Sequence, residues 1–403
     1  MIREIQIENF KSIKKMKLEL GRVNVFIGEN GSGKSNILEA VALAGAAVGG
    51  KLDNEFLASR GIRATEARHM RCALDGSSNG ENIVINIIAS DSTRAELKLS
   101  HDGKPYSSWK RERGPTSFLQ SNTRQVIDDV ERVLKEKARE LNLELNQPSN
   151  KKSQEEHLNE IAALESVILS VKKTLEQTES NLEALEQFFI YSPENYSLRV
   201  FQQEGQIEPL GIRGEGLLKF LKVLSENTEY ANVLAAIRER LKVLGWFEDL
   251  RVPATAISLA SKIEIKDRYL RKEAGNLDQI SANEGFLFLL FYFCLFSTEL
   301  TPRFFAIDNV DASLNPKLCA HLVIELAKLA QENEKQVILT THNPAALDGL
   351  DLNDDEQRLF VISRGDEGET KIRRIKRKEG SSRDIKLSAA FINGYLGGLP
   401  KNF

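Results

Sequence analysis

The segment GENGSGKS, residues 28–35, has the residue types and spacing of a phosphate-binding loop. It fits the pattern GxxxxGK[ST] and lies between the apolar run VNVFI and the helix-forming segment NILEAVALAG. In such a loop the glycines let backbone N–H groups surround a β-phosphate, Lys34 meets the β- and γ-phosphate oxygens, and the Ser35 hydroxyl ligates magnesium. We therefore expect ATP and Mg²⁺ as ligands. The candidate nucleotide-binding residues here are Gly28, Asn30, Gly31, Ser32, Gly33, Lys34, Ser35 and Asn36.

A second candidate for chemistry is the segment FFAIDN, residues 304–309. Four apolar residues predict a buried strand, and Asp308 stands at its carboxyl end, in the position of a residue that holds magnesium through water. The pattern alone is weak. It becomes specific because it follows the phosphate loop by about 270 residues and precedes SLNP and a further strand that ends in TTHNP. Ser35 and Asp308 are thus the candidate metal ligands.

The tract KIRRIKRK, residues 371–378, is strongly basic. Ile372 and Ile375 are interspersed with cations, which predicts a strand with one charged face. Two interpretations stay open. The cations contact phosphates of DNA or RNA, or they keep a solvated edge strand from aggregating.

The elements that must position these residues indicate an α/β fold. Alternating and apolar runs predict strands at EIQIENF, MKLEL, VNVFI, ENIVINIIAS and AELKLS. After residue 190 we expect helices near 215–225 and 230–243, strands near 255–267, a buried helix at 284–297, the strand FFAID, a helix at 316–332, the strand QVILTTH and a final strand pair at RLFVISR and TKIRRIKRK. Strands that alternate with helices favour a mixed, mainly parallel sheet.

The region between these two parts, residues 122–189, is long, charged and nearly free of Gly and Pro. Its apolar residues follow steps of three and four, which is a heptad seam. The members of this seam are Ile161, Leu164, Ile168, Val171, Leu175, Leu182, Leu185 and Phe189. Pro148 separates this helix from a preceding one. We predict an antiparallel coiled-coil hairpin whose arms of about 25 residues reach roughly 37 Å; a hairpin packed flat on the body is the alternative.

This division gives three expected regions: 1–121 and 190–403 form the two halves of one head, and 122–189 forms the hairpin. The composition is that of an ordinary soluble protein, with 403 residues, 41% hydrophobic, 28% charged and a net charge of -3. The longest apolar run has 11 residues, short of the ~20 of a spanning helix. Three scattered cysteines indicate neither disulfides nor zinc. We expect a cytoplasmic protein that does not enter membranes.

The order of these elements resembles the ABC-type ATPase heads of the SMC, RecF and OLD group. The resemblance extends over essentially the whole chain, and it is strongest in the opening IENFKSIKKMKLEL and VNVFIGENGSGKSNILEAV. It implies an ATPase whose nucleotide sites are shared between two heads, so a homodimer or a larger homo-oligomer is expected. It also implies that His342 in TTHNP senses the γ-phosphate.

By the same resemblance, QISANEG at 279–285 stands where the family has the signature Leu-Ser-x-Gly, which meets the phosphate bound by the opposite subunit. Ser281 can still donate to that phosphate. Asn283 replaces the usual glycine, a tolerable change because Asn also enters left-handed backbone conformations. The residues alone predict that Ser281 is the N-cap of the following apolar helix, and both roles are compatible.

The residue after Asp308 is the main departure from the family. A glutamate that polarises the attacking water usually stands there, whereas Asn309 can orient water but cannot accept its proton. Slow hydrolysis is therefore expected. Asp311 could take the role of base if the chain bends as it leaves the strand. The implied catalytic residues are Lys34, Asp308, Asn309, Asp311 and His342.

The segment after His342 contains no spread of carboxylates like that of the TOPRIM nuclease domain in OLD proteins. We therefore expect an ATPase that senses or controls a separate effector, a nuclease or toxin encoded nearby. Stand-alone heads of this kind resemble the ATPase components of two-gene anti-phage systems such as PARIS and Septu. A RecF-like DNA-repair clamp and a non-hydrolysing, ATP-dependent scaffold are the alternatives.

Overall fold

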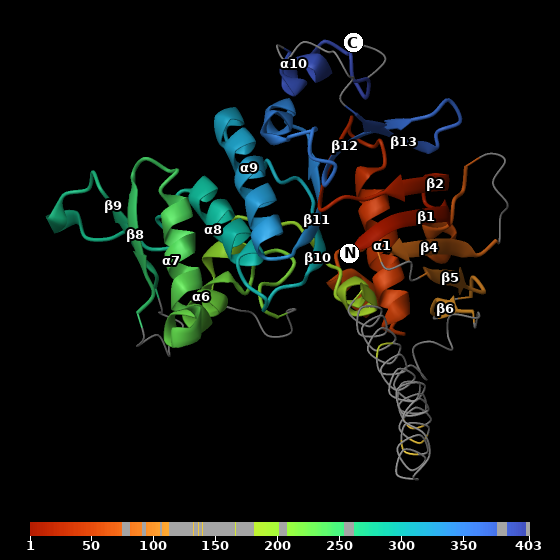
Figure 1. Ribbon diagram of the computed structural model, residues 1–403, viewed down its shortest axis with the longest axis horizontal. Coiled ribbons are helices and arrows are strands. Elements are labelled where there is room, and N and C mark those ends of the chain that lie inside the picture. The colour runs from red at the N-terminus through yellow and green to blue at the C-terminus, as the bar shows by residue number, and fades with distance from the viewer. Residues whose placement is uncertain are drawn as a thin grey trace, which may run out of the picture.

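Two β-sheets with a helix between them form the framework of the candidate site (Figure 1). The computed structural model describes residues 1–74, 81–90, 94–104, 107–112, 181–200, 208–253, 262–376 and 385–399, and four single positions between 132 and 166. Most of the expected coiled-coil hairpin, residues 122–189, lies outside these ranges, so the hairpin stays a prediction.

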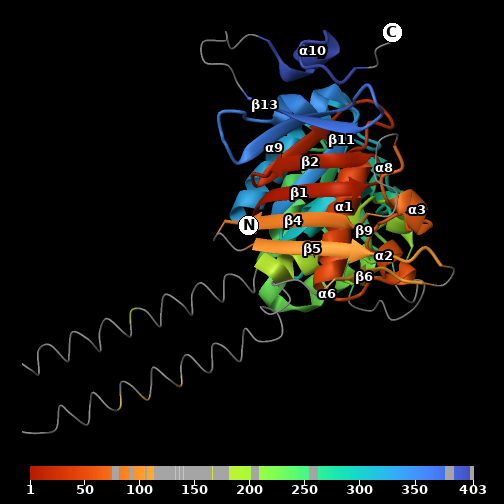
Figure 2. The same ribbon diagram turned by 90° about the vertical axis from the view of Figure 1, so that its right-hand side faces the viewer.

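Sheet A contains the antiparallel strands of the N-terminal part. Its order among the described residues is β2-β1-β4-β5-β6. Figure 2 shows β1, β2, β4 and β5 side by side in front of α1. Alternation along β5 buries every second side chain, which is the pattern of a sheet with one face in the core. The strands are β1 (Ile2–Phe10), β2 (Ile13–Glu19), β4 (Ile83–Ala89), β5 (Arg94–Ser100) and β6 (Lys110–Arg111).

Sheet B contains strands from both the N-terminal and the C-terminal parts of the sequence. Its order in the described ranges is β13-β12-β3-β11-β10-β7, and its neighbours are parallel except for the antiparallel pair β12 and β13. Every residue of β3, β10 and β11 is buried, as expected for parallel strands covered on both faces. The strands are β3 (Val23–Ile27), β7 (Ile190–Tyr191), β10 (Phe304–Ile307), β11 (Gln336–Thr341), β12 (Gln357–Arg364) and β13 (Thr370–Ile375).

Helix α1 (Lys34–Val48) lies between the two sheets and is buried along almost its whole length. It contacts β1 and β5 of sheet A and β7 and β11 of sheet B. A helix that is apolar on all sides is typical of such an enclosed position, and its many alanines let both sheets approach. This burial holds the loop before α1 on a rigid support.

The end of the expected hairpin is anchored on this body. Residues 181–186 are helical, and Leu185 is fully buried against the sheet A core. A Cβ on Gly45 of α1 would lie 2.2 Å from the carbonyl oxygen of Leu185, so the close approach requires glycine there. Arg60 donates hydrogen bonds to the carbonyl oxygens of Glu186 and Phe188. These bonds satisfy carbonyl groups that a helix end leaves without partners.

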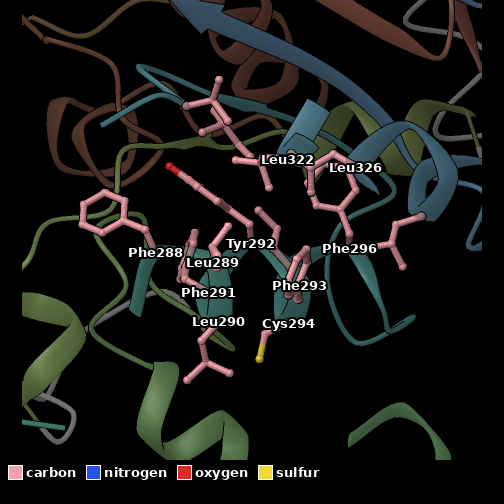
Figure 3. Close-up of a cluster of buried hydrophobic side chains, with 14 of the residues drawn as sticks. Phe288, Leu289, Leu290, Phe291, Tyr292, Phe293, Cys294, Phe296, Leu322 and Leu326 are labelled. Atoms are coloured by element: carbon pink, nitrogen blue, oxygen red, sulfur yellow. The ribbon is translucent and has the colours of Figure 1, made fainter. Parts of the chain in front are cut away.

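A layer of helices covers the other face of sheet B, and α8 lies at its centre. Figure 3 shows its aromatic and aliphatic side chains packed with Leu322 and Leu326 of α9. The helices of this layer are α6 (Leu217–Glu226), α7 (Ala231–Leu241), α8 (Glu284–Phe296) and α9 (Pro316–Glu332). Shorter helices elsewhere are α2 (Asn54–Ser59), α3 (Ala67–Met70), α10 (Leu387–Ile392), η1 (Ser197–Arg199), η2 (Thr228–Tyr230), η3 (Lys272–Ala274) and η4 (Pro344–Gly349). In the described part of the chain, no helix has both the length and the apolar character needed to cross a bilayer.

The mainly parallel α/β architecture confirms the predicted fold class. The predicted helices at 284–297 and 316–332 are α8 and α9. Several elements were not predicted, among them the short strands β6 and β7, the helices α2, α3 and α10, and β8 (Phe247–Arg251), which pairs with β9 (Glu264–Asp267). The boundaries of the three expected regions stay predictions.

Candidate nucleotide-binding site

The phosphate loop connects β3 to α1 at the carboxyl end of sheet B. Gly31 and Gly33 have φ angles of 76° and 105°, which favour glycine. A Cβ on Gly33 would also lie 2.0 Å from Thr370 Oγ1. The loop therefore needs glycine both for its backbone conformation and for its contact with β13.

Lys34 lies inside this loop. Its side chain is buried, and its ammonium donates to the carbonyl oxygens of Gly28 at 2.8 Å and Glu29 at 3.0 Å. Burial lowers the pKa of Lys34 from its ordinary 10.5, while the carboxylates of Asp308 and Asp311 favour its charged form. The lysine thus places a cation beside the loop, where phosphate oxygens would replace the carbonyl contacts.

The two predicted metal ligands are in contact. Ser35 Oγ donates to Asp308 Oδ2 at 3.0 Å, and the Thr340 hydroxyl donates to Asp308 Oδ1. Two oxygen groups this close fit Mg²⁺, which uses few protein ligands and completes its shell with water and phosphate oxygens. Thr340 fixes the orientation of the carboxylate from the neighbouring strand β11.

A cavity of about 320 Å³ opens over the loop. Its lining is polar or glycine, without an apolar side chain, which suits a polyphosphate better than an apolar ligand. Ser32 is fully buried, and its hydroxyl has no hydrogen-bond partner among the described residues. A phosphate oxygen in the cavity would give this hydroxyl an acceptor. The lining residues are Asn30, Gly31, Ser32, Gly33, Lys34, Ser35, Asn36, Arg63, Asn309, His342 and Arg364.

Asn309 lines this cavity, whereas Asp311 is not among its lining residues. Asn309 has a φ of 57°, and its N–H donates to Thr340 Oγ1 at 2.9 Å. Asp311 Oδ1 accepts a hydrogen bond of 3.3 Å from the backbone N–H of His342. The two candidates for the water-polarising role therefore differ in position: one faces the phosphate cavity, and the other supports the histidine segment.

His342 also lines the cavity, on the segment that follows β11. Partial burial and the nearby Lys34 ammonium lower the pKa of His342 from its ordinary 6.5. The neutral imidazole is thus favoured near neutral pH, and it can offer one donor and one acceptor to groups in the cavity.

A comparison with known protein families identifies the family of this chain. Residues 23–348 match the family model described as "AAA domain, putative AbiEii toxin, Type IV TA system". The chain belongs to this AAA-domain family.

Sequence relatives match the AAA-domain chain over short segments. A segment of 109 residues is 38% identical to the DNA double-strand break repair Rad50 ATPase of Methanocaldococcus jannaschii and covers 27% of this chain and 10% of that protein. A segment of 44 residues is 52% identical to the uncharacterized protein MJECL10 of the same organism and covers 11% of this chain and 20% of that protein. The matches thus span about a tenth and a fifth of these relatives.

A solved structure agrees over nearly the whole chain. The SMC head bound to the C-winged helix domain of ScpA superposes with a TM-score of 0.52, at 15% sequence identity, and covers 94% of this chain and 98% of that one. This likeness shows that the AAA-domain chain has the SMC head fold, as the resemblance in its sequence implied.

The signature segment differs from the prediction in two respects. Asn283, not Ser281, is the N-cap of α8, because Asn283 Oδ1 accepts from the N–H of Phe286 at 2.8 Å. Asn283 has an extended backbone with a φ of -71°, so its tolerance of left-handed conformations is not used. Ser281 is exposed, and its N–H and hydroxyl both donate to Asp278 Oδ1 at 2.8 Å. It does not line the phosphate cavity of its own chain.

The basic tract also differs from its prediction. Ile372 packs against the sheet A core and Ile375 belongs to the core on the other side of sheet B, so β13 has no single charged face. Its cations have intramolecular partners: Lys371 pairs with Glu369, Arg373 donates to the carbonyl oxygen of Leu396, and Arg374 pairs with Asp355. β13 is the edge strand of sheet B among the described residues, in agreement with the second interpretation. The last two residues of the tract, Arg377 and Lys378, lie outside the described residues. Contact of this tract with nucleic acid stays a prediction.

Sequence reasoning missed two arginines of the cavity. Arg63 bonds Glu39 at 2.5 Å and Asn36 Oδ1 at 3.1 Å, and Glu39 also pairs with Lys11. Arg364 Nε donates to the carbonyl oxygen of Gly31 at 2.8 Å. Neither lies in a recognisable motif, and only the fold brings them to the loop.

Proposed function

We propose that this AAA-domain chain is an ATPase that binds ATP with Mg²⁺ in the phosphate cavity. One observation carries the proposal: Lys34 lies in the loop, and the Ser35 hydroxyl meets the Asp308 carboxylate at 3.0 Å. Lys34 would hold the β- and γ-phosphates, and Ser35 and Asp308 would hold the metal. Bound Mg²⁺ supplies positive charge for the phosphate oxygens.

Hydrolysis is slow in this proposal. Asn309 faces the cavity in the position where the SMC and RecF group usually has a glutamate, and an amide orients water without taking its proton. The alternative base, Asp311, accepts a hydrogen bond from the His342 backbone and does not line the cavity. ATP occupancy rather than turnover would then set the state of the protein.

ATP would act by joining two heads. Ser281 is exposed and does not line the cavity of its own chain, so its proposed phosphate contact is with the site of a second copy. Arg199 holds this segment from η1 by donating to the carbonyl oxygens of Gln279 and Ile280 at 2.9 and 2.6 Å. A segment fixed in this way can present Ser281 without reorganisation.

The joined heads would control an effector in anti-phage defence. The family description names a toxin and a toxin–antitoxin system, which supports a two-component arrangement. Co-purification of the product of a neighbouring gene, dependent on ATP, tests this step. If that product is neither a nuclease nor a toxin, the defence assignment is wrong.

A second candidate is a DNA-repair clamp, which the likeness to the Rad50 ATPase favours. Gel-shift binding to duplex or gapped DNA that is stronger with ATP would support it. Charge reversal of Arg373 and Arg374 tests the basic strand directly.

Calorimetric titration with ATP tests the common basis of both candidates. We expect one ATP bound per chain, more tightly with Mg²⁺ than with a chelator. Absence of binding contradicts the proposed function, and steady-state phosphate release separates an ATPase from a non-hydrolysing scaffold.

A further inference from the structure

Four carbonyl groups of the phosphate loop accept hydrogen bonds from side chains. Gly28 and Glu29 carbonyls accept from Lys34, the Gly31 carbonyl accepts from Arg364, and the Ser32 carbonyl accepts from Thr370 Oγ1 at 3.1 Å. The last two donors belong to the hairpin of β12 and β13, more than 300 residues away in the sequence.

The Thr370 hydroxyl belongs to a chain of hydrogen bonds with one direction. Its only proton goes to the Ser32 carbonyl, so Thr370 Oγ1 must accept from Ser12 Oγ, which lies 2.6 Å away. Ser12 Oγ in turn accepts from Asn36 Nδ2 at 2.7 Å. Ser12 and Thr370 are buried, and the N–H of Thr370 also donates to the carbonyl of Ser12 at 2.7 Å.

The geometry of the peptide group links this chain to the ligand site. The Ser32–Gly33 peptide is trans, so its carbonyl and its N–H point in opposite directions. When Thr370 holds the Ser32 carbonyl toward β13, the Gly33 N–H turns to the other side, where Gly33 lines the cavity. An inward N–H is the group with which such a loop binds phosphate.

We propose that Thr370 is a positioning residue of the nucleotide site: supported by Ser12 and Asn36, its hydroxyl orients the Gly33 N–H toward the phosphates. This inference rests on the proposed function. It assigns the edge hairpin of sheet B a part in ATP binding, and it explains why Gly33 lies against Thr370 with no room for a Cβ.

Two substitutions at this position separate hydrogen bonding from packing. Thr370→Val keeps the shape and removes the hydroxyl, so the dissociation constants of ATP and ADP should rise about threefold to tenfold. Thr370→Ser keeps the hydroxyl and should bind within about twofold of the wild type. If the valine variant does not fold, Thr370→Ala replaces it, since alanine removes the hydroxyl and adds no bulk.

A matched control removes a buried hydroxyl elsewhere. Thr301 is buried before β10, at the opposite end of the strands, and its hydroxyl donates to the carbonyl of Leu295 at 2.7 Å. Thr301→Val should lower the melting temperature and leave ATP affinity unchanged. A purely structural role of Thr370 predicts the same result for Thr370→Val.

The Gly33 amide provides a direct readout. The dipeptide Ser–Gly occurs once in the chain, at Ser32–Gly33, so carbonyl-labelled serine with ¹⁵N-glycine gives one selected amide signal. We expect ATP with Mg²⁺ to shift this signal in the wild type and in Thr370→Ser, and to shift it less in Thr370→Val. Equal shifts and equal affinities in all three proteins overturn the role of Thr370. A wild type that binds no nucleotide overturns the proposed function, and this inference with it.

Discussion

The phosphate loop and the signature segment, residues 279–285, differ in their relation to the nucleotide cavity of their own chain: the loop lines it, and Ser281 does not. The loop leads into the buried helix α1: Lys34 is bonded to the Gly28 carbonyl, Ser35 is bonded to Asp308, and the Ser32 carbonyl is held by Thr370 of β13. Ser281, by contrast, is exposed, and its bonds are local ones to Asp278. In the proposed function, the loop binds nucleotide with groups of its own chain, whereas Ser281 contacts the nucleotide of a second copy.

The largest effect should come from removing the loop cation. In Lys34→Ala the phosphate charge loses its buried partner, so ATP affinity should fall about 10²-fold or more. Calorimetry measures the loss, and circular dichroism confirms the fold. Lys51→Ala, at an exposed lysine just after α1, serves as the control. Unchanged binding in Lys34→Ala would refute the assignment of the loop.

The next effect concerns turnover within the loop region. Asn309→Glu places a carboxylate at the cavity and should raise the rate of phosphate release about tenfold to a hundredfold, because a positioned base is worth ~10²- to 10⁴-fold. In the control Asn309→Gln, the new side chain has the size of glutamate but no charge, so the rate of phosphate release should not rise. The left-handed backbone at this position, with a φ of 57°, should cost either variant about 1 kcal/mol of stability.

Asp311→Asn completes that experiment. Asn keeps an oxygen that accepts from the His342 N–H, so the segment should stay in place. We expect turnover to change little. Near-complete loss of turnover with intact ATP binding would show instead that Asp311 is the base.

A substitution in the signature segment should change the ATP-dependent association of two heads, with little effect on ATP affinity. Ser281→Arg adds bulk to an exposed residue outside the cavity lining, so ATP should bind within about twofold of the wild type while ATP-dependent association is lost. Light scattering with and without ATP measures the mass, with Ser90→Arg as an exposed control. A wild type that stays monomeric with ATP would rule out the shared site.

The smallest effect is on His342. Its lowered pKa means that the unfolded chain takes up a proton below pH 6.5 before the folded chain does, so stability falls as the pH drops through that range. Lys34→Ala removes a like charge and should raise the pKa of His342, which weakens this dependence. Titration of the imidazole signals by NMR measures the shift, and Lys51→Ala should leave it unchanged.

The sequence predicted the parts whose chemistry is local. The loop, the strand before Asp308 and the buried helix α8 follow from patterns of a few residues. The N-cap of α8 was misplaced by two residues, because Ser281 and Asn283 are both good caps and only the backbone decides between them.

The missed parts depend on contacts between distant segments. Thr370 and Arg364 carry no motif, and they reach the loop because β12 pairs with β3 and β13 pairs with β12. Ser12 comes from the turn between β1 and β2, where its carbonyl accepts a hydrogen bond from the N–H of Thr370. The polar, exposed residues of β8 hid a strand whose partner β9 is also short. The opposite directions of Ile372 and Ile375 follow from their spacing of three, which is odd in a strand of period two.

The place of β3 has a consequence for synthesis on the ribosome. β3 leaves the ribosome early, yet its neighbours in sheet B are β11 and β12, residues 336–341 and 357–364. Its two edges therefore stay without their native partners until most of the chain has been translated, and the bond from Thr370 to the phosphate loop forms later still. Nascent chains arrested before β11 should be cleaved by protease in β3 and should not bind ATP. Chains arrested far enough beyond β13 should gain protease resistance in β3 and ATP binding together.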